Sequence, residues 1–159
     1  MQLLVSLALL LGKNIERKHM SDTVNGLLNT EGEGSLTIDF NGKKYTAGLI
    51  TQKVKADFEK RMEKKALDAV FFLKDNLEPV EFREAISSVT RDIASGTYSF
   101  GSELSIQSMS TPSGAIALAA ALFNAPENEI QSLMMSEKER FEAVMVIVRE
   151  KSFPNAKRG

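Results

Sequence analysis

The pattern of apolar and polar positions predicts that the chain has a β-hairpin near residue 40. In "LTIDFNGKKYTA", apolar and polar residues alternate on both sides of the pair Asn41-Gly42. That pair is typical of a two-residue type I′ turn, because both turn positions need a positive φ angle. The turn fixes the expected register as Phe40 opposite Lys43, Asp39 opposite Lys44, Ile38 opposite Tyr45, Thr37 opposite Thr46 and Leu36 opposite Ala47. One face of this hairpin is apolar and needs helices to cover it.

Residues 52–75 are predicted to form a long amphipathic helix with Thr51 as its N-cap. Its inward positions recur at spacings of three and four: Val54, Phe58, Met62, Ala66, Ala69 and Leu73. The opposite side mixes lysine, arginine and acidic residues, as is typical of a solvated helix face. Phe71 falls on that charged side, near Lys60 and Lys64, since each residue turns the helix by about 100°. Two interpretations stay open for Phe71, namely contact with another part of the chain and an anchor for a partner.

A second helix is predicted from Pro79 to a C-terminal cap at Gly96, antiparallel to the first. Its apolar face holds Phe82, Ile86, Val89 and Ile93. The loop "GTYSFGS" that follows carries Tyr98 and Phe100, whose rings are expected to plug the core. Its glycines do not match a phosphate-binding pattern, because no lysine stands in the P-loop position.

The stretch "TPSGAIALAAALF" predicts a buried central helix with Thr111 as cap and Pro112 as its first residue. It is apolar on every side and too short to span a membrane, so neighbouring elements should surround it. Two more helices are predicted to begin at Pro126 and at a capping box from Ser136 to Glu139. Their inward residues are Ile130, Leu133 and Met134 in the first, and Phe141, Val144, Met145 and Val148 in the second. The expected fold is mainly α with a leading β-hairpin (α+β), a compact multi-helix domain around the apolar helix.

The sequence divides into four segments. Residues 36–153 form the expected single globular domain, residues 154–159 a polar tail, and residues 20–35 a flexible segment rich in Asn, Gly, Thr and Glu. Residues 1–19 hold the apolar run "LLVSLALLL", for which three interpretations stay open. It is a secretory signal, an authentic N-terminal segment, or upstream sequence read in frame before a true start at Met20, because residues 16–18 are encodable by purine-only codons that resemble a ribosome-binding site.

Composition removes most of the usual catalytic groups. The chain of 159 residues has no cysteine and a single histidine, His19, and its formal net charge is −1. A start at Met20 removes Lys13, Arg17 and Lys18 against Glu16, together with His19, and shifts the net charge to −3. Without cysteine or histidine, the usual nucleophile, general base and commonest metal ligand are missing together. The weak acidic charge also gives no field that attracts nucleic acid or an anionic membrane.

No motif in the chain identifies a reaction. The serines lack a Gly-x-Ser-x-Gly elbow, and the acidic residues show neither EF-hand nor phosphoryl-transfer spacing. We therefore expect a non-enzymatic protein with no catalytic residue, cofactor or metal.

The order of elements resembles a family of viral proteins. The β-hairpin "DFNGKKYTAGLIT", the charged helix "DFEKRMEKKALDAV", then "DIASGTYSFGS" and the apolar "GAIALAAALF" are similar to small proteins of bacteriophage structural-gene clusters, especially tail assembly chaperones. The resemblance covers residues 36–153. It implies a protein of the host-cell cytoplasm that holds apolar segments of the tape-measure protein during tail assembly.

The expected mechanism is binding of a protein partner by apolar surface, without nucleic acid or membrane. The candidate anchors are Phe71, Tyr98, Phe100, Met134 and Met135, because aromatic rings supply contact area and methionine adapts to varied partners. Self-association stays open. The alternatives are a structural virion component, such as a head or connector protein, and a small cytosolic nucleic-acid-binding regulator.

Overall fold

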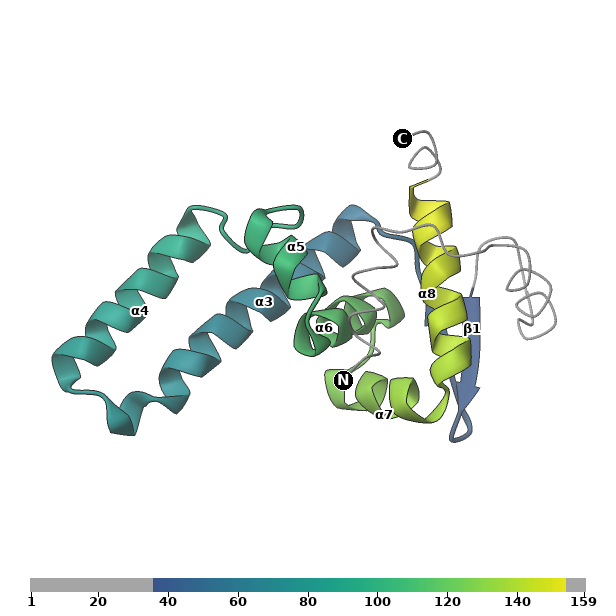
Figure 1. The fold of residues 1–159 in the computed structure, drawn as a ribbon, viewed down its shortest axis with the longest axis horizontal. Coiled ribbons are helices and arrows are strands. Elements are labelled where there is room, and N and C mark those ends of the chain that lie inside the picture. Colours follow the sequence, from purple (N-terminus) through teal and green to yellow (C-terminus); the bar gives the residue numbers. More distant parts are fainter. Residues whose placement is uncertain (1–35, 154–159) are drawn as a thin grey trace.

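The computed structural model describes residues 36–153, and the predictions for residues 1–35 and 154–159 lie outside the described residues. The described part is mostly helical, with a two-stranded antiparallel sheet at its N-terminal side, which confirms the mainly α fold (Figure 1). The elements are β1 (Leu36–Phe40), β2 (Lys43–Ala47), α3 (Gln52–Phe72), the 3-10 turn η1 (Lys74–Asn76), α4 (Pro79–Ala94), α5 (Glu103–Met109), α6 (Pro112–Phe123), α7 (Glu127–Ser136) and α8 (Lys138–Ser152).

The β-hairpin has the predicted register at all five residue pairs. Asn41 and Gly42 have φ angles of 50° and 73°, as a type I′ turn requires. Its inner face packs on α8 through β1 and on α6 through β2, and Ile38 and Ala47 are almost completely buried there. The expectation that helices cover one face is therefore confirmed.

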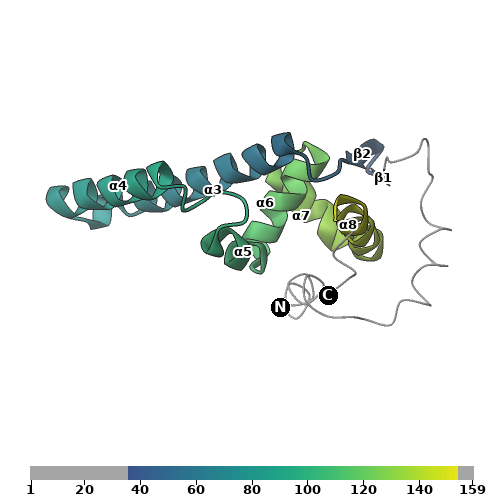
Figure 2. The ribbon, with the colours of Figure 1, turned by 90° about the horizontal axis from the view of Figure 1, so that it is seen from above.

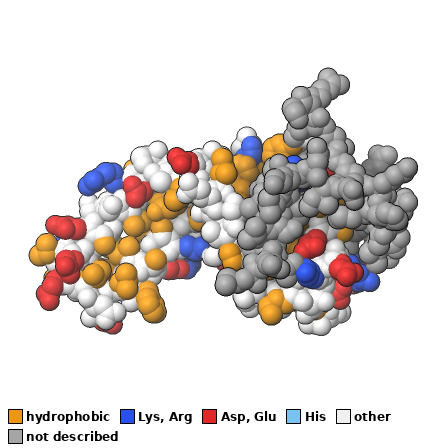
Figure 3. All heavy atoms as spheres, viewed as in Figure 1, with side chains coloured by type: hydrophobic (Ala, Val, Ile, Leu, Met, Phe, Trp, Pro, Cys, Tyr) orange, Lys and Arg blue, Asp and Glu red, His pale blue; other side chains and the backbone are white. Residues whose placement is uncertain are grey.

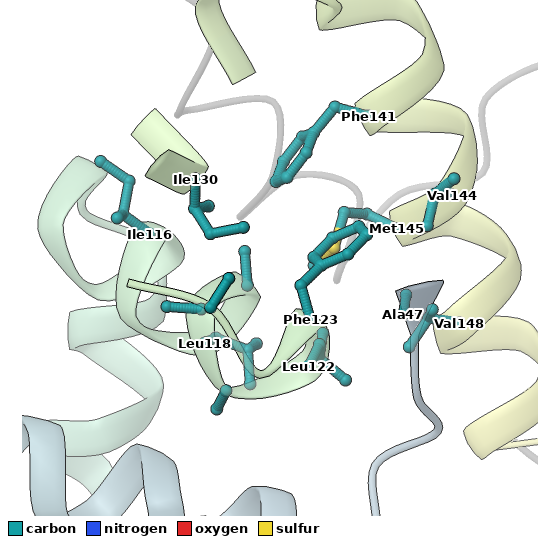
Figure 4. Packing of buried hydrophobic residues seen from close by; sticks show 14 of the residues in the cluster. Ala47, Ile116, Leu118, Leu122, Phe123, Ile130, Phe141, Val144, Met145 and Val148 are labelled. Carbon is teal, nitrogen blue, oxygen red and sulfur yellow. The ribbon is translucent and has the colours of Figure 1, made fainter. Parts of the chain in front are cut away.

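Helix α6 is the centre of the domain, as predicted. The Thr111 hydroxyl oxygen accepts a hydrogen bond from the N–H of Gly114 at 3.1 Å, which caps the helix, and Pro112 is its first residue. Every residue of the range 114–123 is buried, and α3, α5, α7 and β2 all contact this helix. The Phe123 and Phe141 rings stack with centroids 6.0 Å apart, and Ala47 lies next to Val148 (Figure 4).

Helix α3 begins as predicted but ends three residues earlier. The Thr51 side chain accepts from the N–H of Val54, and the helix ends at Phe72, before the 3-10 turn that contains Asp75. Only Val54 and Phe58 of this helix are buried. Ala69 and Leu73 were expected to face inward and are exposed, because the core ends before the helix does.

The outer part of α3 and the whole of α4 form a helical hairpin that projects from the domain. We call residues 60–94 the α3–α4 hairpin and residues 72–80 its free end. Both ribbon views show it extending away from α6, α7 and α8 (Figures 1 and 2). Helix α4 is antiparallel to α3, and its first turn is closed by a capping box in which the Glu81 carboxylate accepts from the N–H of Glu78 at 3.0 Å.

Two local features differ from the sequence predictions. The short helix α5 was not predicted; Ser102 caps it, and Ser105 and Met109 are its buried residues. The capping box from Ser136 to Glu139 is wrong. Ser136 is the last residue of α7, and Glu137 takes the N-cap position of α8 without a side-chain cap. The two helices follow each other so closely that Ser136 has helical geometry and cannot cap.

Candidate protein-binding surface

The acidic side chains of the described residues do not gather into a metal-binding cluster. Within residues 36–153, no group of three or more Asp or Glu side chains is placed to hold a metal ion. No single helix among them has both the length and the apolar character to cross a membrane. The bent pair Glu103–Met109 and Pro112–Phe123, with 93° between its helices, meets those two criteria when taken together.

Phe71 lies near the end of α3 and contacts the other helix of the hairpin. Its ring meets the ring of Phe82 edge to face, with centroids 5.7 Å apart. The side chain nevertheless stays 56% exposed. Both features considered from the sequence are thus present: Phe71 contacts another part of the chain, and it offers apolar surface to solvent.

Tyr98 and Phe100 lie in the loop between α4 and α5, and Phe100 packs toward the core. The Phe100 ring meets the Phe58 ring edge to face, with centroids 5.8 Å apart. The backbone N–H of Phe100 donates a hydrogen bond to the Glu59 carboxylate at 2.6 Å. Tyr98 is half-buried, and this burial, together with the charge of Asp92, raises the pKa of its phenol. These contacts place the Phe100 ring against the domain, where it fixes the base of the α3–α4 hairpin.

The two candidate methionines on α7 differ. Met134 is half-buried against the core cluster, whereas Met135 is 76% exposed. Figure 1 shows α7 at one side of the molecule and the free end of the α3–α4 hairpin at the other. The structure therefore does not bring the five candidate anchors together into one surface.

The most extensive apolar surface follows α3 beyond the core, where sequence reasoning expected buried residues. The stripe that buries Val54 and Phe58 continues along the same side of α3 at Ala66, Ala69 and Leu73. No residue from 60 to 94 is buried. The lengths of the two helices could have predicted this exposure. The 21 residues of α3 are about 31 Å long and the 12 residues of α6 only about 18 Å, so α6 cannot cover the whole of α3.

Helix α4 contributes the second half of this surface. Phe82, Ile86, Val89 and Ile93 recur at spacings of four, three and four, and all four are half-buried. This spacing is the a/d pattern of helices that pack in bundles. Helix α3 covers only part of this apolar face of α4, so each of the four side chains keeps part of its surface in water.

The free end of the hairpin is the most exposed apolar part. Phe72 is 84% exposed, and Leu73 and Val80 are 45% and 56% exposed. Figure 3 shows apolar side chains gathered over both helices of the hairpin on one face of the molecule. Apolar surface that is continuous over two helices is a feature of protein interaction sites. We call the apolar surface of residues 60–94 the hairpin face.

The charges of the hairpin are unevenly distributed along its length. The free end together with the first turns of α4 is acidic, since the range 74–84 holds Asp75, Glu78, Glu81 and Glu84 against Lys74 and Arg83, and Figure 3 shows acidic side chains at this end. Its base is basic, since the range 60–65 holds Lys60, Arg61, Lys64 and Lys65 against Glu63.

Two of the basic residues at the base attach α3 to α7. Lys65 Nζ lies 2.7 Å from the Glu127 carboxylate, and Arg61 lies 3.8 Å from the same residue. Arg61 also donates to the carbonyl oxygen of Ala125 at 3.4 Å. Lys60 and Lys64 are exposed, and Lys64 pairs with Asp68 of its own helix. The base of the hairpin is thus held, while the free end is not.

Three titratable side chains, Lys43, Tyr45 and Glu129, join the β-hairpin to α7. Glu129 accepts hydrogen bonds from Lys43 Nζ at 2.6 Å and from the Tyr45 hydroxyl at 2.8 Å. The hydrogen bond from Lys43, followed by the one from Tyr45, lowers the pKa of Glu129. The same carboxylate raises the pKa values of Lys43 and Tyr45. The Tyr45 ring is buried, so this cluster acts as an attachment of the sheet.

Comparisons of the chain with protein-family models, with curated proteins and with solved structures gave no match in any of the three.

Proposed function

We propose that the chain is a non-enzymatic protein that binds apolar helical segments of another protein along its hairpin face. The observation that carries this proposal is the absence of any buried residue from 60 to 94, although this range holds two amphipathic helices. Helices in proteins owe most of their stability to the packing of an apolar face. A partner helix laid between α3 and α4 supplies the packing that the chain itself does not.

The shape and chemistry of the hairpin face favour a helical client. The two antiparallel helices present apolar side chains next to one another, and an amphipathic helix binds such a surface through apolar residues at spacings of three and four. The half-buried Val70 and Val89 and the exposed Leu73 offer it aliphatic contacts. In this proposal Tyr98, Phe100 and Met134 are not anchors for the partner, because they pack at least partly on the domain.

The resemblance to tail assembly chaperones supports a more specific proposal. In that function the client is an apolar segment of a phage tape-measure protein, held in the host cytoplasm until the tail assembles. A protein with this function has no catalytic residue, cofactor or metal, and binds neither nucleic acid nor membrane. These points belong to the proposal.

The proposal is tested with a fluorescent amphipathic helix made of leucine and lysine, titrated with the full chain and followed by anisotropy. Leu73→Glu places a charge on the hairpin face and should weaken binding about 100-fold, because burying an unpaired charge is costly. A scrambled peptide of the same composition without helical periodicity should not bind. Equal binding of both peptides would contradict the proposal.

Met135→Glu is the matched control, since Met135 is as exposed as the residues of the free end but lies on α7. It should leave the affinity unchanged. A loss of affinity in this variant with no loss in Leu73→Glu would move the binding surface to α7. Retention of the chain in purified phage particles would instead favour the structural virion component.

A further inference from the structure

We infer that the turn of the β-hairpin is a site of covalent modification, at which Asn41 loses its side-chain amide group in the folded chain and becomes aspartate or isoaspartate. The reacting groups are the side-chain amide of Asn41, the backbone nitrogen of Gly42 and a water molecule. The inference depends on the geometry of this turn, and not on the proposed function.

The reaction has two steps. In the first, the backbone nitrogen of Gly42 gives up its proton and attacks the Cγ atom of Asn41. A cyclic succinimide forms, the bond from Cγ to Nδ2 breaks, and ammonia leaves with the proton. In the second step, water adds to one of the two ring carbonyls and opens the ring. Addition at Cγ leaves aspartate at position 41, whereas addition at the main-chain carbonyl leaves isoaspartate, whose backbone runs through Cβ and Cγ.

The fold leaves the attacking nitrogen accessible to water. Asn41 and Gly42 are both exposed, and they lie between Phe40 and Lys43, which form the last pair of the ladder. In a two-residue turn, the peptide that joins the two turn residues stands outside the ladder. Among the described residues, a Cβ atom placed on Gly42 would meet nothing within 4 Å apart from its chain neighbours. The glycine peptide therefore has space to rotate toward Asn41 Cγ.

Asn124 at the end of α6 provides a comparison within the same chain. Its φ angle is 48° against 50° at Asn41, and it is also exposed. The nitrogen that follows it differs, because Ala125 is buried and its N–H donates to the Ala120 carbonyl oxygen at 3.0 Å. The attack would have to break this hydrogen bond, which should slow it about fivefold. The modification should therefore distinguish two asparagines with nearly the same backbone conformation.

The two products should affect the β-hairpin differently. Aspartate followed by glycine also suits a type I′ turn, so the register should persist. Isoaspartate adds one carbon atom to the backbone of a turn whose length sets the register. The strain falls on the Phe40–Lys43 pair, and Lys43 is the residue whose Nζ atom lies 2.6 Å from the Glu129 carboxylate. Isoaspartate should therefore loosen the attachment of the sheet to α7.

The first test is incubation of the folded full chain at mildly alkaline pH, followed by cleavage after glutamate and mass spectrometry. The peptides 34–59 and 104–127 each hold one asparagine, Asn41 and Asn124 respectively. Asn41 should give two products of equal mass, at least about fivefold faster than Asn124 reacts, and its rate should rise with pH because the attacking nitrogen must lose a proton. An Asn41 that stays intact in the folded chain and reacts in urea would overturn the inference.

Ala125→Gly is the matched variant, because Phe-Asn-Gly then stands at both positions. In urea, Asn124 of this variant and Asn41 should react at similar rates. In the folded variant, Asn124 should react about fivefold more slowly, because the backbone hydrogen bond to Ala120 remains possible. Equal rates in the folded state would overturn the role of the turn geometry.

The second test compares the two products by thermal unfolding. Asn41→Asp represents the aspartate product and should keep the Tm of the parent chain. The isoaspartate form, separated by chromatography after incubation, should have a Tm lower by about 2–4 °C. An isoaspartate form that unfolds at the same temperature as the parent chain would contradict the loosening of the sheet.

Discussion

Gly114 of α6 lies directly against the backbone of Ser108 in α5, so closely that a Cβ atom on Gly114 would overlap the Ser108 carbonyl group. The short helix α5 therefore packs on the central helix through backbone. This contact lies at the turn between α5 and α6.

Replacement of Gly114 by alanine should lower the free energy of unfolding by about 1–3 kcal/mol, because a backbone contact cannot yield as a side chain can. Gly48→Ala is the matched control, since its Cβ would meet only the Leu122 carbonyl oxygen, at an ordinary 3.6 Å. It should change stability by less than about 0.5 kcal/mol. Urea unfolding followed by circular dichroism measures both. Equal stabilities of the two variants would contradict the close approach.

The Phe58–Phe100 contact should appear as an energetic coupling between the core and the base of the hairpin. Phe58→Leu, Phe100→Leu and the double variant form a cycle measured by urea unfolding. Edge-to-face pairs contribute about 0.5–1.5 kcal/mol beyond burial, and the coupling energy should fall in this range. Additive single effects, within about 0.3 kcal/mol, would show that the two rings stabilise the fold independently.

Stability should depend on pH through the carboxylate of Glu129. Its pKa is lowered from 4.5, so its contribution is present above pH 4.5 and lost as the pH falls through the lowered pKa. The raised pKa values of Lys43 and Tyr45 add contributions present below pH 10.5 and 10.0 and lost at higher pH.

Glu129→Gln should flatten the acid side of a plot of Tm against pH. Glu84→Gln on α4 is a control that should leave the acid side as it is in the parent chain. An unchanged acid slope in Glu129→Gln would show that the contacts with Lys43 and Tyr45 do not persist in solution.

Hydrogen exchange should separate α6 from α4. In the Leu73→Glu variant without peptide, the amides of α4 should exchange much faster than those of α6, because α4 has no buried residue and α6 is buried from Gly114 to Phe123. Mass spectrometry of peptic peptides measures both. Equal protection of the two helices would mean that the hairpin is covered even in this variant.

The sequence predicts this fold well where local rules decide it. The pair Asn41-Gly42 sets the register of the β-hairpin through turn geometry alone, and the apolar run of α6 can only be buried. The short α5 was missed because seven residues make barely two turns, too few for periodicity to show. The capping box at Ser136 was wrongly predicted because a serine three residues before a glutamate has the capping-box pattern even when the serine ends a preceding helix.

The candidate surface was harder to predict, for a physical reason. Periodicity identifies which side of a helix is apolar, but not how far along the helix the core reaches. Leu73 and Phe58 share one stripe, yet Phe58 is buried and Leu73 is exposed. Phe100 was a candidate anchor because aromatic rings suit interfaces, and its position against Phe58 is a tertiary contact that no spacing reveals.

Because α3 is continuous, the α3–α4 hairpin is attached rigidly to the core. One uninterrupted helix joins Phe58, which is fully enclosed, to Phe72, about 21 Å further along the axis. A tilt of about 10° at Phe58 then displaces the free end by about 4 Å. A partner that displaces the free end would therefore also move α3 at Phe58, where the Phe100 ring packs on it.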